Sequence, residues 1–239
     1  TKPINFEDLQ VTMEKTLKHV LHIKDTLKAI KENNILKMYV DENVLNFMGS
    51  REYESSIMET ETVEATVMFV DICSFSSISE TADADVVVQL LNNYFDVMVK
   101  EIIEQGGHID KFIGDAVMAV FRGNFHLDRA IDAALAVRSK VGLLPSVSDQ
   151  FTPKVSIGIN SGEMISGNIG SVTLKRLDYT VIGDTVNTAQ RLQSIAKPNQ
   201  IIISEAAWEN VKESFNCRKV GDVALKNKQQ EVAVYEVVD

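Results

Sequence analysis

Short apolar runs alternate with longer amphipathic stretches between residues 65 and 160, in the order strand, helix, strand, strand, helix, strand. This order is that of a split βαβ unit, the ferredoxin-like βαββαβ arrangement. The sequence therefore predicts an α+β fold, an α/β sandwich with a ferredoxin-like core. We expect the core strands at 65–72, 108–113, 116–122 and 153–160, and the core helices at 83–105 and 126–142.

Extra strands and helices extend this core toward the carboxyl end of the chain. Gly114-Asp115 separates two of the apolar runs, and a Gly-Asp pair in that position favours a tight hairpin turn. The same patterns predict strands at 200–204, 216–225 and 231–237, and helices at 184–196 and 204–213.

Residues 6–36 differ from the rest of the chain, because they are rich in Lys, Glu, Leu and Thr and contain neither Gly nor Pro. This composition favours a helix. Side chains in alternating steps of four and three form the seam expected of a coiled coil, over about three heptads. An amphipathic helix packed on its own domain explains the spacing equally well. The seam positions are Leu9, Met13, Thr16, Val20, Ile23, Leu27 and Ile30.

The sequence thus divides into an N-terminal helical linker at 1–40 and a mixed domain of strands and helices at 41–239. The chain opens at Thr1 without an initiator Met, so we expect it to be a fragment of a longer protein. No apolar run is long enough to cross a bilayer, and we expect no membrane segment in this chain.

Charge and cysteine content limit the partners and the compartment. A formal net charge of -10, without a Lys/Arg run, would repel a polyphosphate backbone, which argues against nucleic acid as a partner. The two cysteines, Cys73 and Cys217, lie far apart in sequence without metal-ligand spacing. We therefore expect both thiols to be reduced and the protein to be cytoplasmic.

Two aspartates occupy positions where a metal site is feasible. Asp71 ends an apolar strand, and Asp115 lies at the predicted hairpin tip. Taken alone, each is more simply a capping or turn-forming residue. If the hairpin lies beside the first strand, the two carboxylates can meet and hold hard divalent cations together with phosphate oxygens.

Three further polar residues are candidates for contacts with a ligand. Asn187 and Arg191 are four residues apart on a predicted helix and share one face. Lys226 lies at a predicted strand end, two residues before a second lysine, Lys228. Taken alone, these residues are more simply a solvated helix face and ordinary surface lysines.

Taken together, the motifs FVDICSF, DKFIGDAVMAVF, SIGINSGEMISGNIGS and YTVIGDTVNTAQRL resemble those of the class III nucleotidyl cyclases, in the family's order and spacing. The resemblance covers roughly residues 35–239. It implies an adenylate cyclase that converts ATP to 3′,5′-cyclic AMP and pyrophosphate. It also implies a head-to-tail homodimer with active sites at the interface, so that one chain alone is inactive.

The resemblance assigns the metal site and the base-reading positions. Asp71 and Asp115 match the two aspartates that bind two divalent cations, Mg²⁺ or Mn²⁺, and the backbone carbonyl of Ile72 matches a further oxygen ligand. Lys111 matches the position that reads the purine, with a Lys where guanylate cyclases carry Glu. Thr180 matches its partner position, as in a subgroup with a Lys/Thr pair.

Catalytic and phosphate-binding roles follow from the same resemblance. Asn187 matches the residue that positions the ribose, and Arg191 the residue that stabilises charge around the α-phosphate. Lys226 matches the triphosphate-binding lysine. Ser156 departs from the family, because many relatives carry an Arg there, and Lys154 or Lys175 is the candidate substitute.

Four alternative functions fit the sequence less well. A guanylate cyclase is disfavoured by Lys111, and a regulatory domain without catalysis is disfavoured by the presence of all the expected polar residues. A diguanylate cyclase or P-loop enzyme would need turn motifs that the sequence lacks. Within the cyclase reading, residues 6–36 are expected to be a parallel dimeric linker from an upstream sensor domain.

Overall fold

The computed structural model divides into two compact units, Thr1–Ile57 and Met58–Asp239, which we describe separately. The predicted boundary between residues 40 and 41 lies outside the described residues. The structure describes residues 6–37, 60–80, 82–145, 152–171, 176–223 and 231–239.

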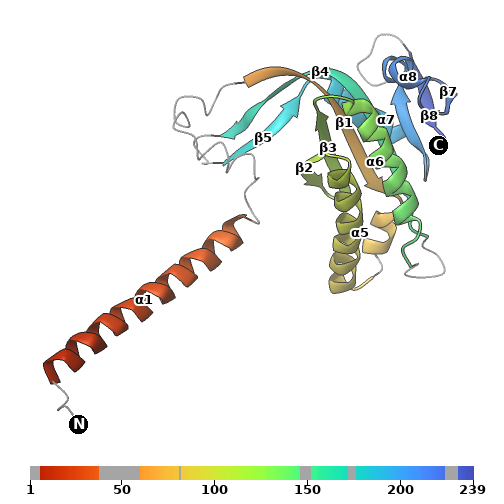
Figure 1. Ribbon diagram of the computed structural model, residues 1–239. Helices are drawn as coiled ribbons and strands as arrows, with labels where there is room; N and C mark the ends of the chain where they lie inside the picture. Colours follow the sequence, from red (N-terminus) through yellow and green to blue (C-terminus); the bar gives the residue numbers. More distant parts are fainter. Residues whose placement is uncertain (1–5, 38–59, 81, 146–151, 172–175, 224–230) are drawn as a thin grey trace. The chain divides into compact units, whose positions relative to one another are not determined.

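The first unit contains one long helix, α1 (Phe6–Lys37), drawn in red and orange in Figure 1. The helix predicted at 6–36 is therefore present. Each of its apolar seam side chains that has a described burial is exposed by half or more of its surface. These are Met13, Val20, Ile23, Leu27 and Ile30.

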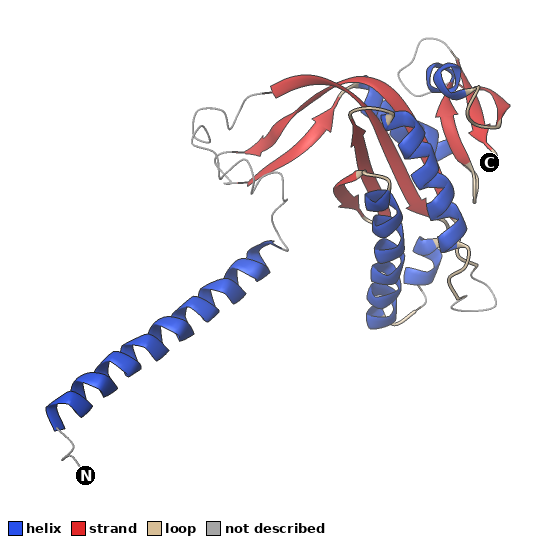
Figure 2. Ribbon diagram, in the orientation of Figure 1, coloured by secondary structure: helices blue, strands red, loops and turns tan. Residues whose placement is uncertain are grey.

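The second unit is built on one eight-stranded sheet in the order β2-β3-β1-β4-β6-β8-β7, with β5 paired to β4. Figure 2 shows the strands in red and the helices that cover them in blue. The strands are β1 (Thr60–Ile72), β2 (His108–Ile113), β3 (Ala116–Arg122), β4 (Val155–Ser171), β5 (Arg176–Ile182), β6 (Ile201–Ser204), β7 (Cys217–Val223) and β8 (Val232–Val237). The helices are α4 (Phe75–Ser79), α5 (Ala84–Glu104), α6 (His126–Val141), α7 (Asp184–Ile195) and α8 (Glu205–Val211).

Half of this sheet is the predicted ferredoxin-like core. The elements β1, α5, β2, β3, α6 and β4 follow one another in the chain, and their strands lie in the order β2-β3-β1-β4. All three of these neighbouring pairs are antiparallel. The α+β fold and its ferredoxin-like core are thus confirmed.

From Ala65 to Val70, strand β1 is buried on both faces because helices cover the sheet on either side. Met68 and Val70 point into a core shared with α5 and α6, whereas Val67 and Phe69 point into a second core shared with α7. Successive side chains of a strand point to opposite faces, so a continuous apolar run is what a doubly covered strand requires.

The largest difference from the predicted elements is the long hairpin of β4 and β5. The sequence predicts a strand that ends at residue 160 and no further strand before α7. Several glycines follow residue 160, and glycine has low strand propensity. In the structure β4 continues to Ser171, with β1 on one side and β5 on the other. Backbone hydrogen bonds to β1 as far as Gly167, and to β5 from Ile165 onward, stabilise this part of the strand in spite of its glycines.

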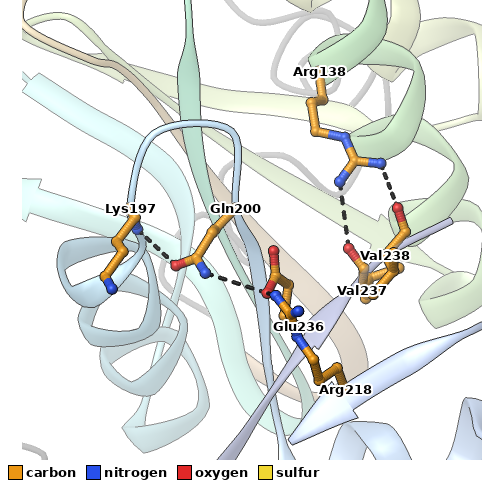
Figure 3. A network of polar contacts seen from close by, with 7 residues as sticks. All are labelled: Arg138, Lys197, Gln200, Arg218, Glu236, Val237 and Val238. Atoms are coloured by element: carbon orange, nitrogen blue, oxygen red, sulfur yellow. Dashed lines mark hydrogen bonds and ion pairs between the residues drawn. The ribbon is translucent and has the colours of Figure 1, made fainter. Parts of the chain in front are cut away.

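The carboxyl-terminal strand β8 is tied to the rest of the sheet by polar contacts, shown in Figure 3. Arg138 of α6 donates to the carbonyls of Val237 and Val238, at 3.4 and 2.7 Å. Glu236 accepts from Gln200 at 3.2 Å and from Arg218 at 2.7 Å. These contacts fix the strand that follows the segment containing Lys226.

Candidate active site

The register of three strands places the two predicted carboxylates at one end of the sheet. Asp71, next to last in β1, lies opposite Ala116 of β3 and Ser156 of β4. Asp115 comes directly before Ala116, in the turn between β2 and β3. Gly114 has φ of 62° in that turn, a conformation that glycine adopts without a steric penalty.

Burial and mutual repulsion act on this carboxylate pair. Partial burial, followed by the charge of Asp115, raises the pKa of Asp71 from 3.8 to about 6. Both causes disfavour the negative charge on Asp71. A divalent cation between the two carboxylates would offset both of them.

The donor set fits a hard cation that keeps other oxygen ligands. Two carboxylates are available, and Ile72 can offer only its backbone oxygen because its side chain is a hydrocarbon without a donor atom. Among the residues that the structure describes, no group of three or more His, Cys, Asp or Glu side chains is placed to hold a metal. Mg²⁺ commonly binds through one or two carboxylates and completes its shell with water and substrate phosphates.

A second cluster lies where β2 meets β5. The Thr180 hydroxyl donates to both carboxylate oxygens of Asp110, at 2.8 Å each. The Lys111 ammonium lies 3.2 Å from Oδ1 of the same carboxylate. The structure thus brings the two predicted base-reading residues, Lys111 and Thr180, to one shared anion.

Helix α7 carries the predicted amide and guanidinium. Asn187 is exposed and Arg191 is partly exposed, and neither side chain has a hydrogen bond or ion pair to any other residue in the described part of the chain. The opposite side of the helix is buried through Val186 and Ala189. Both polar groups are therefore available to a ligand.

The position of α7 depends on close backbone packing against β4. A Cβ atom on Gly158 would collide with the backbone of Ala189 and Gln193. The absence of a side chain at residue 158 is what lets the helix approach the sheet this closely.

The residues discussed for phosphate binding have different outcomes. Lys226 and Lys175 lie outside the described residues. Ser156 is buried and accepts a hydrogen bond from Gln193 at 3.0 Å, so its side chain serves packing between β4 and α7. Lys154 is partly exposed. Burial raises the pKa of the Cys73 thiol, two residues after Asp71, and the positive charge of Lys154 partly opposes that rise.

Three groups of predicted residues therefore form: Asp71 with Asp115, Lys111 with Thr180, and Asn187 with Arg191. Across the described ranges, no hydrogen bond or ion pair joins one group to another. A complete site for a nucleotide thus needs the ligand, a second chain or both to connect them.

Two features that position the site were not predicted. Asp110 was noted only as part of a motif, and its contact with Thr180 depends on β5, which was not expected. Arg122 of β3 helps to hold β5 in place. Its guanidinium pairs with Glu61 of β1 at 3.1 Å and lies 5.8 Å from the ring centroid of Tyr179 of β5. In the sequence, only the position of Asp110 directly before Lys111 hints at its contact with the base-reading residues.

Comparison with known proteins gives a consistent result. Residues 57–238 match the adenylate and guanylate cyclase catalytic domain. An adenylate cyclase of Anabaena cylindrica is 31% identical over 241 residues, covering 96% of this chain and 45% of that protein. Adenylate cyclase 1 of Rhizobium meliloti is 32% identical over 186 residues, covering 73% of this chain and 27% of that protein. The chain spans less than half the length of these two curated relatives.

Solved structures with this fold include enzymes of both base specificities. The adenylyl cyclase CyaB from P. aeruginosa matches with a TM-score of 0.68 and 34% identity, over 76% of this chain and 97% of that one. A bacterial light-regulated adenylyl cyclase matches with a TM-score of 0.76 and 27% identity, over 92% of this chain and 64% of that one. The guanylate cyclase domain of RhGC from Catenaria anguillulae, in complex with GTP, matches with a TM-score of 0.68 and 26% identity, over 74% and 98%.

Proposed function

Because this chain belongs to the family of adenylate and guanylate cyclase catalytic domains, the class III nucleotidyl cyclases, we propose that it converts ATP to 3′,5′-cyclic AMP and pyrophosphate. The observation that carries the proposal is the strand register that sets Asp71 beside Asp115. In the reaction, the ribose 3′-oxygen attacks the α-phosphorus and the bond to the bridging oxygen of the β-phosphate breaks. The 3′-hydroxyl loses its proton to Asp71 or to solvent.

Asp71, Asp115 and the backbone oxygen of Ile72 hold two divalent cations, Mg²⁺ or Mn²⁺, in this proposal. When bound, such cations lower the pKa of the 3′-hydroxyl and offset the charge of the pyrophosphate. The protein supplies no nucleophile, since the substrate carries its own. Its contribution is positioning and electrostatic stabilisation, on which phosphoryl transfer mainly depends.

The remaining residues orient the nucleotide. Asn187 binds the ribose, Arg191 stabilises charge that develops around the α-phosphate, and Lys226 binds the triphosphate. The free state of the Asn187 and Arg191 side chains, in the described part of the chain, supports these roles. Rigid placement of such groups removes entropy that would otherwise add to the barrier.

The preference for ATP rests on Lys111 and Thr180. A Lys ammonium donates hydrogen bonds and suits the unprotonated N1 of adenine, whereas N1 of guanine carries a proton. The Thr180 hydroxyl can accept from the adenine 6-amino group. Some structural neighbours are guanylate cyclases, so cyclic GMP formation is the competing outcome.

We place the active sites at the interface of a head-to-tail homodimer. Phe112 and Ile113, beside the turn that carries Asp115, are exposed apolar side chains that a second chain would cover. In this arrangement one chain supplies the carboxylate pair and its partner supplies the base-reading residues and α7. A single chain alone is then inactive.

Helix α1 is proposed to join the two chains outside the catalytic domain. Its exposed apolar seam has the spacing of a two-stranded coiled coil. A parallel pairing of residues 6–36 would connect the catalytic domains to an upstream sensor domain. Cysteine crosslinking of Met13→Cys between chains tests this parallel pairing, because equivalent seam positions near one end of the helix meet only in that orientation.

Within the described residues, no helix has both the length and the apolar content that crossing a membrane requires. The two cysteines are free, as expected, and the cytoplasmic location inferred from them stays a prediction.

The decisive experiment measures cyclic AMP and cyclic GMP made from ATP and GTP, with Mg²⁺ or Mn²⁺, across a range of protein concentrations. We expect cyclic AMP, at a rate that rises faster than linearly with protein. Asp71→Asn and Arg191→Ala should each be inactive, and Asp85→Asn, an exposed acid at the start of α5, should be active. Absence of product from both nucleotides under all conditions would overturn the proposal.

Mixing the two inactive variants tests the shared site. Half of the randomly formed dimers then combine Asp71→Asn with Arg191→Ala, and each of these contains one intact site of two, so about a quarter of wild-type activity should return. If no activity returns on mixing, both sets of residues act within one chain and the head-to-tail arrangement is wrong.

A further inference from the structure

Asp110 is the extra residue of a β-bulge between β2 and β3. Ile109 pairs with Ala119 and Lys111 with the next residue, Met118, so that Asp110 has no partner in the register. In a regular strand, neighbouring side chains point to opposite faces. The bulge changes this direction, and the Asp110 carboxylate and the Lys111 ammonium meet at 3.2 Å on the same side.

The Asp110 carboxylate fixes the direction of one proton. Its side chain is only 3% exposed, and it lies 2.8 Å from the Thr180 hydroxyl through each oxygen. An ionised carboxylate only accepts hydrogen bonds, so the single hydroxyl proton of Thr180 must point toward it. The lone pairs of that hydroxyl are then the part left for a ligand.

We propose that Asp110 is a positioning residue for base recognition, which holds the Thr180 hydroxyl as an acceptor and thereby selects a purine with an amino group at position 6. This inference rests on the proposed reading of adenine by Lys111 and Thr180. The 6-amino group of adenine donates hydrogen bonds, whereas the 6-oxo group of guanine only accepts them. A hydroxyl that is held as an acceptor therefore favours the 6-amino group of adenine and offers no donor to the 6-oxo group of guanine.

The same carboxylate leaves Lys111 able to act. An ammonium has three donors, and one of them is directed to Asp110, so that others remain for the base. The Lys111 side chain is 37% exposed, in contrast to the nearly buried Asp110. The Asp110 carboxylate thus orients both base-reading groups. Lys111 is held as a donor for N1 of adenine, and Thr180 is held as an acceptor for the 6-amino group.

Asp110→Asn tests the inference because it keeps the shape and removes the charge. The Lys111 ammonium should attract the amide oxygen of the new side chain, which turns its NH₂ group toward Thr180. The hydroxyl then receives a hydrogen bond and its own proton is free to point at the base. Thr180 would become a donor, which opposes the 6-amino group.

The measurement is the ratio of kcat/KM for ATP to kcat/KM for purine riboside triphosphate, which retains N1 and lacks the 6-amino group. Wild type should prefer ATP by about three- to tenfold, the usual worth of one hydrogen bond. Asp110→Asn and Thr180→Val should each bring the ratio close to one, and the double variant should go no further. Asp178→Asn, an exposed change on β5 two residues from Thr180, should keep the wild-type ratio.

The ratio separates positioning from general damage, because a loss of structure lowers turnover of both substrates alike. If Asp110→Asn lowers both rates and leaves the ratio unchanged, the inference is overturned while the proposed function stands. If wild type makes cyclic AMP but shows no preference, Thr180 does not read the 6-amino group and the inference is likewise overturned. If wild type makes no cyclic AMP, the proposed function fails instead. Should Asp110→Asn not fold, Asp110→Ser, which also lacks the charge, is measured in the same way with the same expected ratio.

Discussion

Two carboxylates of this molecule, the partly buried Asp71 and the nearly buried Asp110, have opposite electrostatic surroundings. Asp71 meets a second carboxylate, Asp115, which together with burial raises its pKa to about 6. Asp110 meets a cation, Lys111, and a hydroxyl donor, Thr180. A charge held without compensation marks a place where a ligand belongs, whereas a compensated charge organises the residues around it.

Loss of activity should separate the two carboxylates most clearly. Asp71→Asn removes a proposed metal ligand and should lower kcat for cyclic AMP formation about a thousandfold or more, since metal ions contribute several kcal/mol to such reactions. Asp110→Asn should reduce kcat/KM for ATP by tenfold or less. Initial rates of both purified variants measure these losses. Equal losses of activity would contradict the assignment of Asp71 as a metal ligand and Asp110 as a positioning residue.

Thermal stability in the presence of metal should show the next largest effect. A ligand at a hundred times its Kd stabilises the folded state by about 2.7 kcal/mol. Saturating Mg²⁺ should therefore raise the Tm of wild type and of Asp110→Asn by several degrees, and that of Asp71→Asn by much less. Differential scanning fluorimetry with and without Mg²⁺ measures this. An undiminished shift in Asp71→Asn would place the cation elsewhere.

Without metal, the two asparagine substitutions should change stability in opposite directions. Asp110→Asn disturbs a buried and satisfied carboxylate and should lower the free energy of unfolding by about 1–3 kcal/mol. Asp71→Asn removes a repelled charge and should raise it by on the order of 1 kcal/mol, after allowance for solvent screening. Urea denaturation in a chelating buffer at pH 7 measures both, with Asp85→Asn as the charge-matched control. The same sign in both variants would contradict the contrast.

The pH dependence of stability should show the smallest effect. Because the pKa of Asp71 is raised when the protein is folded, the folded state binds more protons than the unfolded state between about pH 4 and pH 6. This group therefore makes the metal-free protein less stable as pH rises through that window, by on the order of 1 kcal/mol. The difference in unfolding free energy between wild type and Asp71→Asn, measured at several pH values, isolates the contribution of Asp71. A difference that does not change with pH would mean that Asp71 titrates normally.

Much of the core could be predicted from sequence because its signals are local. The bounds of β2 and β3 match the expected strands residue for residue, since a Gly-Asp turn separates two clear apolar runs. The same turn explains why the approach of Asp115 to Asp71 could be expected. Only the pairing of β3 with β1 had to be supplied by the fold.

The features that the sequence did not reveal depend on contacts between distant segments. The end of β4 contains several glycines and is stabilised by its pairing with neighbouring strands rather than by strand propensity. The residues at 179–182 in β5 are of types that favour strands, and their place in the sheet is given by the pairing with β4. The bulge at Asp110 appears only in the register between two strands. The roles of Asp71, Ile72, Asp115, Lys111, Thr180, Asn187, Arg191 and Lys226 came from the family resemblance and stay proposals.

The close packing at Gly158 has a consequence for regulation. Because the backbone of α7 lies directly against β4, the helix cannot slide or tilt without pushing the central strands of the sheet. Asn187 and Arg191 are therefore coupled mechanically to the same rigid body as Asp71. In the proposed dimer, an incoming signal would have little to adjust inside either chain, and the quantity left to control is the angle at which two stiff bodies face each other.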